Sequence, residues 1–280
     1  CGEHSLEDAP GFTLHLAAGD SLLHGRHQLE MRFDGFDAAS ALSGFAYDTE
    51  DLAQLREILT PDRYDVVVGN PPYITVKDRR ISAAYRDLYA SCKGKYQLTV
   101  PFLERFFELA RSAQPGSAGW VGQITSNAFT KREFGTKVIE NFLPQKDLRL
   151  LIDSSGAYIP GHGTPTIILT AKNQLPTSGT VPAVIARKGE SASELGVHGG
   201  PLWLSMAANH RAIGYSDEWI EVVEFSRQSL HKHPWSLGGG AEQKLKKSLT
   251  AEGAPKLKTF AHRIGFFGIT GADEMFLLPP

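Results

Sequence analysis

The residues best suited to chemistry are Asn70, Pro71, Pro72 and Tyr73, which directly follow the run Val66-Val67-Val68-Gly69. Three β-branched residues in succession predict a short strand that is buried on both faces. A glycine and two prolines cannot continue such a strand, so the chain must leave it in a stiff loop at its carboxyl end. In an open α/β sheet, this end of the strands borders the crevice where ligands bind.

The loop offers two hydrogen-bond acceptors beside an aromatic ring. Its prolines lack N–H groups and fix their own φ angles, so the loop keeps one shape and presents its carbonyl groups outward. Asn70 adds a side-chain carbonyl, and Tyr73 adds a flat face for stacking. This set suits a planar substrate with an –NH2 group, because holding both hydrogens of an aromatic amine localises its lone pair for attack on an electrophile. The alternative interpretation is a proline-rich turn that only ends a core strand.

Residues 70–73 resemble the signature of amino-methyltransferases that use S-adenosylmethionine, in particular the branch that methylates N6 of adenine in DNA. The resemblance implies a Rossmann-like α/β fold and catalytic roles for Asn70, Pro71, Pro72 and Tyr73. Tyr73 would stack on the adenine, while Asn70 and the Pro71 carbonyl would accept its two N6 hydrogens. The base must be flipped out of double-stranded DNA for this, since its amine cannot be reached inside the stack.

Two further residues are candidates for binding the cofactor. Residues 12–18 alternate enough to predict a strand, which Gly19-Asp20 ends, and an acidic residue there is well placed to accept a hydrogen bond from a cofactor amine. The resemblance implies that Asp20 meets the adenine of S-adenosylmethionine and that Phe102 packs against it. Phe102 also fits the apolar stripe of a helix predicted over residues 98–111, so a core role is compatible with this one.

The remaining pattern predicts further elements of an α/β sheet. A short helix is expected over residues 51–59, strands over 120–125, 148–153 and 166–170, and a helix carrying Phe134, Val138, Ile139 and Phe142. The glycines of residues 156–164 allow a tight turn between two strands. In the resembled fold this connection lies beside the flipped base, which makes Tyr158 and His162 candidate contacts to the target base or the DNA backbone.

The order of these elements matches the second half of a methyltransferase sheet, and no glycine-rich turn for the methionine part of the cofactor follows a predicted strand. We therefore expect residues 1–175 to be the C-terminal half of a catalytic domain whose N-terminal cofactor-binding half is missing, and the fragment to be inactive alone. After residues 172–174 the sequence becomes rich in Pro, Ser, Thr and Gly, which predicts a domain boundary. Residues 176–280 would form a connector and the beginning of a target-recognition domain. They include a predicted helix at 241–249 and a segment, 264–276, that resembles the opening of such domains.

Three motifs together, at residues 69–77, 123–127 and 156–166, resemble the adenine methyltransferases of phage-exclusion systems (BREX and phage growth limitation). The resemblance spans nearly the whole chain. It implies that double-stranded DNA is the substrate and that other phage-defence proteins are partners.

Composition narrows the functional classes. With 280 residues, 41% of them hydrophobic, the chain can bury a core, and a net charge of −2 excludes a histone-like polycation but not a local DNA-binding face. Two cysteines without a CxxC pair indicate a reducing compartment and no zinc knuckle. The sequence shows no long apolar run and no signal peptide, so a cytoplasmic protein without a membrane partner is expected. His24 and His27 lack a third ligand nearby, and no metal site is predicted.

Three other functions are alternatives to DNA methylation. A protein-glutamine N5-methyltransferase also uses Asn-Pro-Pro-Tyr, but its Glu-Pro-x-x-Ala-Leu element after the loop is absent here. A nuclease would need Asp62 and Glu242-Gln243-Lys244 to form one metal site across a long separation, and Asp62 adjoins the valine strand. A catalytically incomplete DNA-binding fragment remains an alternative because of the missing cofactor turn.

Overall fold

The computed structural model describes residues 13–24, 50–112, 117–161, 163–196 and 199–239, with a few isolated residues beyond. The chain divides into two compact units, residues 1–239 and 240–280, and the fold described here is that of the first. Most of the predicted helix at 241–249, and all of the segment 264–276, lie outside the described residues.

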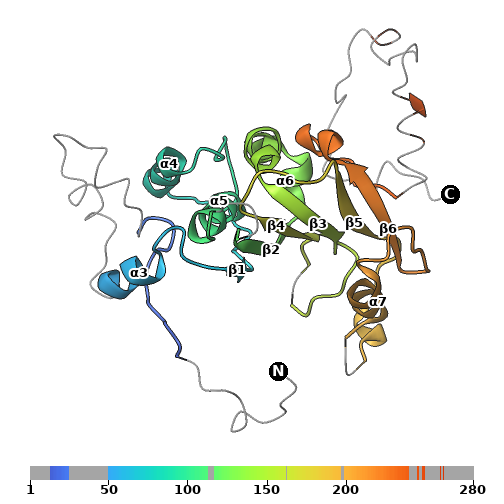
Figure 1. The fold of residues 1–280 in the computed structure, drawn as a ribbon, viewed down its shortest axis with the longest axis horizontal. Helices are drawn as coiled ribbons and strands as arrows, with labels where there is room; N and C mark the ends of the chain where they lie inside the picture. The colour runs from blue at the N-terminus through green and yellow to red at the C-terminus, as the bar shows by residue number, and fades with distance from the viewer. Residues whose placement is uncertain are drawn as a thin grey trace, which may run out of the picture. The chain divides into compact units, whose positions relative to one another are not determined.

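Within the described residues, a six-stranded mixed sheet has the order β1-β2-β4-β3-β5-β6 (Figure 1). The strands are β1 (Val66–Gly69), β2 (Trp120–Ser126), β3 (Asp147–Asp153), β4 (Thr166–Lys172), β5 (Thr180–Ala186) and β6 (Ile220–Ser226). β1 and β2 are parallel, and β3 runs the same way because β2 and β3 each pair antiparallel with β4. The carboxyl ends of β1, β2 and β3 therefore share one edge of the sheet. This mixed α/β sheet confirms the predicted fold class.

Helices pack on both faces of the sheet. They are α3 (Leu52–Ile58), α4 (Arg79–Leu88), α5 (Thr99–Leu109), α6 (Ala128–Lys131) and α7 (Pro201–Asn209). In Figure 1, α5 and α6 lie beside β1–β4, whereas α7 lies below β5 and β6. Ala183 of β5 belongs to the core shared with α5, and its neighbour Val184 to the core under α7. Successive residues of a strand point to opposite faces, so this alternation places the two cores on the two sides of the sheet.

The valine strand forms as predicted, but the prediction that both its faces are buried is wrong. β1 lies at the edge of the sheet and pairs, among the described residues, with β2 alone. Val67 packs against the core, whereas the side chains of Val66 and Val68 are 58% and 72% exposed. A run of apolar residues indicates burial only when neighbouring elements cover both faces, and here one face of β1 is open.

Residues 13–18 do not form the predicted strand. They are described and carry no strand hydrogen bonds, and Leu14 and Leu16 are 69% and 72% exposed. A strand needs a neighbour to satisfy its backbone groups, and no described strand lies beside this segment. The other strands, and the helices at residues 51–59 and 98–111, are confirmed within a few residues of their predicted bounds.

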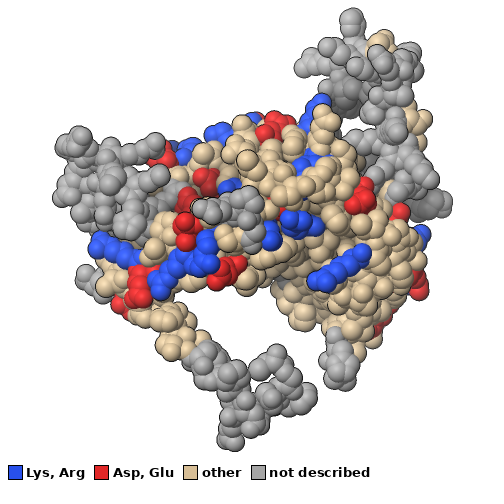
Figure 2. All heavy atoms as spheres, viewed as in Figure 1, with Lys and Arg blue, Asp and Glu red and all other residues tan. Residues whose placement is uncertain are grey.

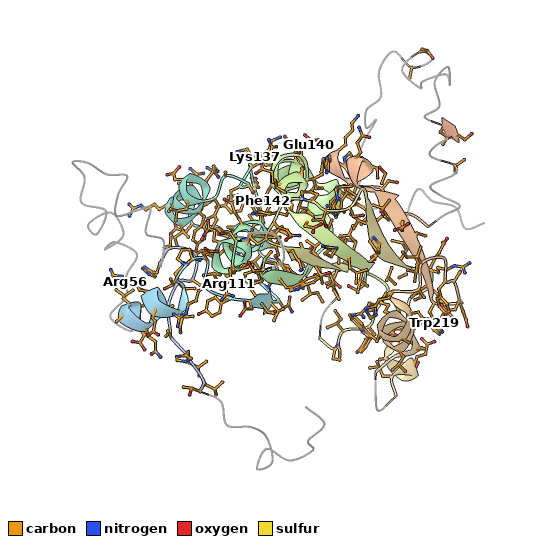
Figure 3. All side chains as sticks on the ribbon, in the orientation of Figure 1. Arg56, Arg111, Lys137, Glu140, Phe142 and Trp219 are labelled. Atoms are coloured by element: carbon orange, nitrogen blue, oxygen red, sulfur yellow. The ribbon has the colours of Figure 1, made fainter. Side chains whose placement is uncertain are left out.

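The helix predicted around Phe134–Phe142 forms, but it is irregular. A 3-10 turn (η1, Glu133–Gly135) precedes a single π-helical turn (η2, Val138–Phe142) and another 3-10 turn (η3, Leu143–Gln145). Pro144 has no N–H to continue a regular helix. The predicted buried face is nevertheless present, because Phe142 (labelled in Figure 3) contacts Phe107 of α5 edge to face, with ring centroids 5.4 Å apart.

The sheet continues beyond residue 175, where the sequence predicts the catalytic domain to end. β5 pairs in parallel with β3 and antiparallel with β6. Arg227, directly after β6, donates to Asp147 Oδ1 at 3.3 Å and to the Leu148 carbonyl at 2.8 Å, which ties β6 to the start of β3. The predicted division therefore does not coincide with a break in this sheet, and the assignment of residues 176–280 to a connector and recognition region stays a prediction.

Among the described residues, no helix combines the length and apolar character needed to cross a bilayer.

Candidate active site

The loop that follows β1, residues 70–78, is called the Asn70 loop below. Tyr73 donates its hydroxyl hydrogen to Asn70 Oδ1, with 2.5 Å between the two oxygens. Asn70 and Pro72 are exposed, Pro71 is buried, and Tyr73 is half-buried, so burial raises the pKa of its hydroxyl. The structure thus brings the two predicted reacting side chains together at the carboxyl edge of the sheet.

Helix α5 holds the Asn70 loop at both ends. At its start, the Phe106 ring lies so close to Gly69 that a Cβ there would come within 2.6 Å of Phe106 Cζ. Glycine is therefore the residue that lets the strand approach α5 before the loop begins. Further along, the Leu98 amide donates to the Ile74 carbonyl at 2.9 Å. These two contacts fix where the loop leaves the sheet and where it returns to the helix.

The same helix carries Phe102 and grips a second segment. Phe102 is partly buried and meets Phe106 edge to face, with ring centroids 6.1 Å apart. Arg105, one turn further along, is 1% exposed and donates to the carbonyls of Ser21 (3.2 Å) and His24 (2.7 Å). The spacing of three residues puts Phe102 and Arg105 on neighbouring positions of the helix surface. Phe102 therefore lies on the side of α5 that holds residues 20–24.

Residues 20–24, called the Asp20 turn below, are organised by the Asp20 carboxylate. Its Oδ1 accepts from the amides of Leu22 (2.8 Å) and Leu23 (3.1 Å), and its Oδ2 accepts from the Tyr85 hydroxyl at 2.5 Å. Tyr89 donates to the Leu22 carbonyl at 2.8 Å. Both tyrosines are on or next to α4, so α4 and α5 together hold the turn.

The Asp20 turn fits the adenine end of the implied cofactor. An ionised carboxylate has about four acceptor positions. Within the part of the chain that the structure describes, three donors use Asp20, two on Oδ1 and one on Oδ2, which leaves one acceptor position on Oδ2. Asp20 is half-buried, so part of this residue is exposed to solvent.

Sequence reasoning missed Tyr85, which lies 65 residues from Asp20. The available signal was weak: Tyr85 is the one buried residue of α4, and it shares the apolar side of this helix with Ile81 and Leu88. Glu50 was also missed, and its Oε1 accepts from the Asp20 amide at 3.1 Å.

Tyr158 reaches the same sheet edge as Asn70, because it follows β3. Its amide donates to Glu190 Oε1 at 3.1 Å, and its carbonyl accepts from Trp203 Nε1 at 3.4 Å. The structure therefore fixes the Tyr158 backbone against the segment after β5 and places no described contact between Tyr158 and the Asn70 loop. His162 lies outside the described residues.

Exposed cationic side chains lie at the end of the Asn70 loop and at the start of α4. Lys77, Arg79 and Arg80 are all exposed at the start of α4, where Asp78 caps the helix by accepting from the Arg80 amide at 2.7 Å. On the face drawn in Figure 2, acidic and basic residues are otherwise interspersed. Among the described residues, no cluster of three or more His, Cys, Asp and Glu side chains could hold a metal ion.

A separate cavity of about 620 Å³ lies before β1 and thus at the opposite end of this strand from the Asn70 loop. Its walls include Asp62, Phe107, Phe142, Lys146 and Asn173. The Lys146 ammonium donates to Asn173 Oδ1 at 2.8 Å and lies 5.0 Å from the Phe107 ring centroid. Desolvation lowers the pKa of Lys146. Asn173 and Phe107, the partners of Lys146, are walls of the cavity itself. We therefore assign this cavity no part in the site described here.

The chain is similar in sequence to known DNA-modification enzymes. Residues 22–159 match the model of the Eco57I restriction-modification methylase family. The adenine-specific methyltransferase PglX of Streptomyces coelicolor is 42% identical over all of this chain, which covers 24% of that protein. The type II methyltransferase M.BstVI of Geobacillus stearothermophilus is 26% identical over 51% of the chain, which covers 25% of it. The chain thus spans about a quarter of the length of these two relatives.

Among solved structures, a modification subunit of a putative type I restriction enzyme from Vibrio vulnificus aligns with 58% of the chain and 34% of its own, at 16% identity and a TM-score of 0.44. The methyltransferase subunit of a type I system from Streptococcus thermophilus aligns with 60% and 35%, at 14% identity and a TM-score of 0.42. On the sequence relationships, residues 22–159 are similar to the Eco57I restriction-modification methylases, and the whole chain is similar to part of an adenine-specific methyltransferase.

Proposed function

We propose that this protein methylates N6 of a flipped-out adenine in double-stranded DNA, with S-adenosylmethionine as the methyl donor. The observation that carries the proposal is the Asn70–Tyr73 pair, held at the carboxyl edge of β1 by α5. The match of residues 22–159 to a family of restriction-modification methylases supports DNA as the substrate, and the 42% identity to an adenine-specific enzyme supports the base.

Asn70 would act on the amine rather than on the DNA backbone. A side-chain carbonyl oxygen accepts two hydrogen bonds, so Oδ1 can keep the Tyr73 hydroxyl and still take one N6 hydrogen. The Pro71 carbonyl would accept the other hydrogen, and Pro72 would keep the loop rigid between the two groups. With both hydrogens held, the nitrogen lone pair is localised and aimed at the donor, which supplies an electrophilic methyl group when bound.

Asp20 and Phe102 would hold the adenine of the cofactor. The remaining acceptor position on Asp20 Oδ2 suits the exocyclic amine, and Phe102 lies on the side of α5 that holds the Asp20 turn. Tyr158 and His162 are proposed contacts to the flipped base or its strand. We also propose that the protein acts in the cytoplasm with other phage-defence proteins, which the likeness to phage-exclusion methyltransferases supports.

Transfer of a labelled methyl group tests the proposal, measured on a protein that contains these residues together with the glycine-rich turn for the methionine part of the cofactor. A duplex containing every base should become labelled at N6 of adenine, identified after digestion to nucleosides, whereas a poly(dG)·poly(dC) duplex should stay unlabelled. Label in a glutamine-containing peptide, with none in DNA, would favour the glutamine methyltransferase. DNA binding without any transfer would favour a catalytically incomplete DNA-binding fragment.

A further inference from the structure

The Asp20–Tyr85 hydrogen bond involves the carboxylate oxygen that, among the described residues, retains a vacant acceptor position, so the bond can serve ligand binding as well as folding. Oδ1 accepts from the amides of Leu22 and Leu23, whereas Oδ2 has one donor among the residues that the structure describes, the Tyr85 hydroxyl at 2.5 Å. A hydrogen bond to one lone pair of Oδ2 fixes the plane of the carboxylate and so the direction of the other lone pair.

We propose that Tyr85 is a positioning residue that aims the vacant acceptor of Asp20 at the exocyclic amine of a bound adenine nucleoside. This rests on the proposed role of Asp20 in cofactor binding. Tyr85 would determine specificity for the amine through Asp20, without itself contacting the ligand.

The surroundings of Tyr85 suit such a role. Its side chain is 6% exposed, so it has little freedom to release Asp20. Burial, followed by the bond to Asp20, raises the pKa of Tyr85, which keeps the hydroxyl protonated as a donor at neutral pH. Tyr85 also lies on α4, the helix that directly follows the Asn70 loop. An adenine held at Asp20 is thereby linked through one side chain to the helix next to the proposed catalytic residues.

Tyr89 provides a matched control. It follows α4 directly, is fully buried, and donates its hydroxyl hydrogen to the same turn at 2.8 Å, but to the Leu22 carbonyl and not to the carboxylate. Tyr85→Phe and Tyr89→Phe each remove one hydroxyl that binds this turn. Only Tyr85→Phe releases Oδ2.

The experiment measures binding of adenosine and of purine riboside, which lacks the amine, to this chain and to both variants. Loss of a hydrogen bond to a charged group costs on the order of tenfold in affinity, so the wild-type chain should bind adenosine about tenfold more tightly than purine riboside. Tyr85→Phe should reduce this preference to about twofold, while Tyr89→Phe should retain it. Thermal unfolding without ligand checks that both variants fold.

A third variant establishes where the nucleosides bind. Asp20→Asn keeps an oxygen to cap the turn but replaces the accepting Oδ2 with an –NH2 group, so the preference for adenosine should vanish.

The remaining outcomes overturn the inference in distinguishable ways. If Tyr85→Phe keeps the preference, or if both tyrosine variants lose it equally, Tyr85 has only a structural role while the proposed role of Asp20 stands. If the wild-type chain shows no amine-dependent binding, or if Asp20→Asn retains it, the role of Asp20 is wrong and the inference fails with it.

Discussion

Tyr73 and Asn70 are joined by a hydrogen bond from the tyrosine hydroxyl to the asparagine Oδ1, across 2.5 Å. The bond fixes which end of the Asn70 amide faces the aromatic ring. It also gives Tyr73 two separable functions, since its ring can stack on a base while its hydroxyl orients Asn70. If Tyr73 acted only by stacking, Tyr73→Phe would leave methyl transfer unchanged. Because its hydroxyl also binds Asn70, we expect this variant to have an effect.

We therefore expect Tyr73→Phe to keep base flipping but to slow methyl transfer several-fold, because Asn70 loses its orienting donor. Tyr73→Ala should impair both, since stacking on a base contributes roughly 1–3 kcal/mol. Fluorescence of 2-aminopurine at the target position reports flipping, and single-turnover transfer reports chemistry. If Phe impaired flipping as much as Ala, the stacking role of the ring would be wrong.

Asn70→Ala should slow methyl transfer by about 10²–10³ while DNA affinity stays nearly unchanged, because the lost contact acts on the amine in the transition state. Single-turnover kinetics with labelled cofactor, together with a DNA-binding titration, separate the two effects. Near-normal transfer would rule out the proposed mechanism.

Gly69→Ala should disturb the site through packing. The added methyl group would meet the Phe106 ring within 2.6 Å, so either α5 or the start of the Asn70 loop must shift. We expect the rate of methyl transfer to fall strongly while the free energy of unfolding falls only slightly. Gly179→Ala is the control, because a Cβ there meets nothing within 4 Å. Equal transfer rates in the two variants would show that the loop tolerates the shift.

The parts of the site that depend on neighbouring residues in the sequence could be predicted. Val66–Gly69 and the prolines after it specify a strand and a stiff loop, and both form. The Asp20–Tyr85 bond could not be predicted, since it joins residues 65 apart through the packing of α4. The failed strand at residues 13–18 has the same cause. Alternating residues show which side chains could share a face, but only a neighbouring strand supplies the hydrogen bonds.

Stability should depend on pH through Asp147. Its side chain is fully buried, which alone would raise the pKa, but hydrogen bonds from Gln174 and Thr177 outweigh this and lower it below the ordinary value of 3.8. The unfolded chain then binds this proton more readily than the folded one. The stabilisation is thus complete above the ordinary pKa and is lost as the pH falls through the folded-state value.

Asp147→Asn tests this. The variant leaves the 7%-exposed Arg227 without its anionic partner, which typically costs about 3–5 kcal/mol. Urea unfolding between neutral and acidic pH should show lower stability at neutral pH and a flatter acid dependence than in the wild-type chain. An unchanged slope would assign the acid sensitivity to other carboxylates.

The open edge of β1 should make this chain self-associate. Val66 and Val68 point to the same face, are 58% and 72% exposed, and Trp120, paired with Val66, is 41% exposed beside them. An apolar edge strand with unpaired backbone groups is a template for pairing with another chain, and a charge on it opposes that pairing. Val68→Lys should therefore raise the monomer fraction in sedimentation velocity.

Ile213→Lys is the matched control, because Ile213 is 55% exposed but lies in the turn after α7, away from β1. If both lysines had the same effect, added charge alone would explain it, and a monodisperse wild-type chain would show that the edge is protected.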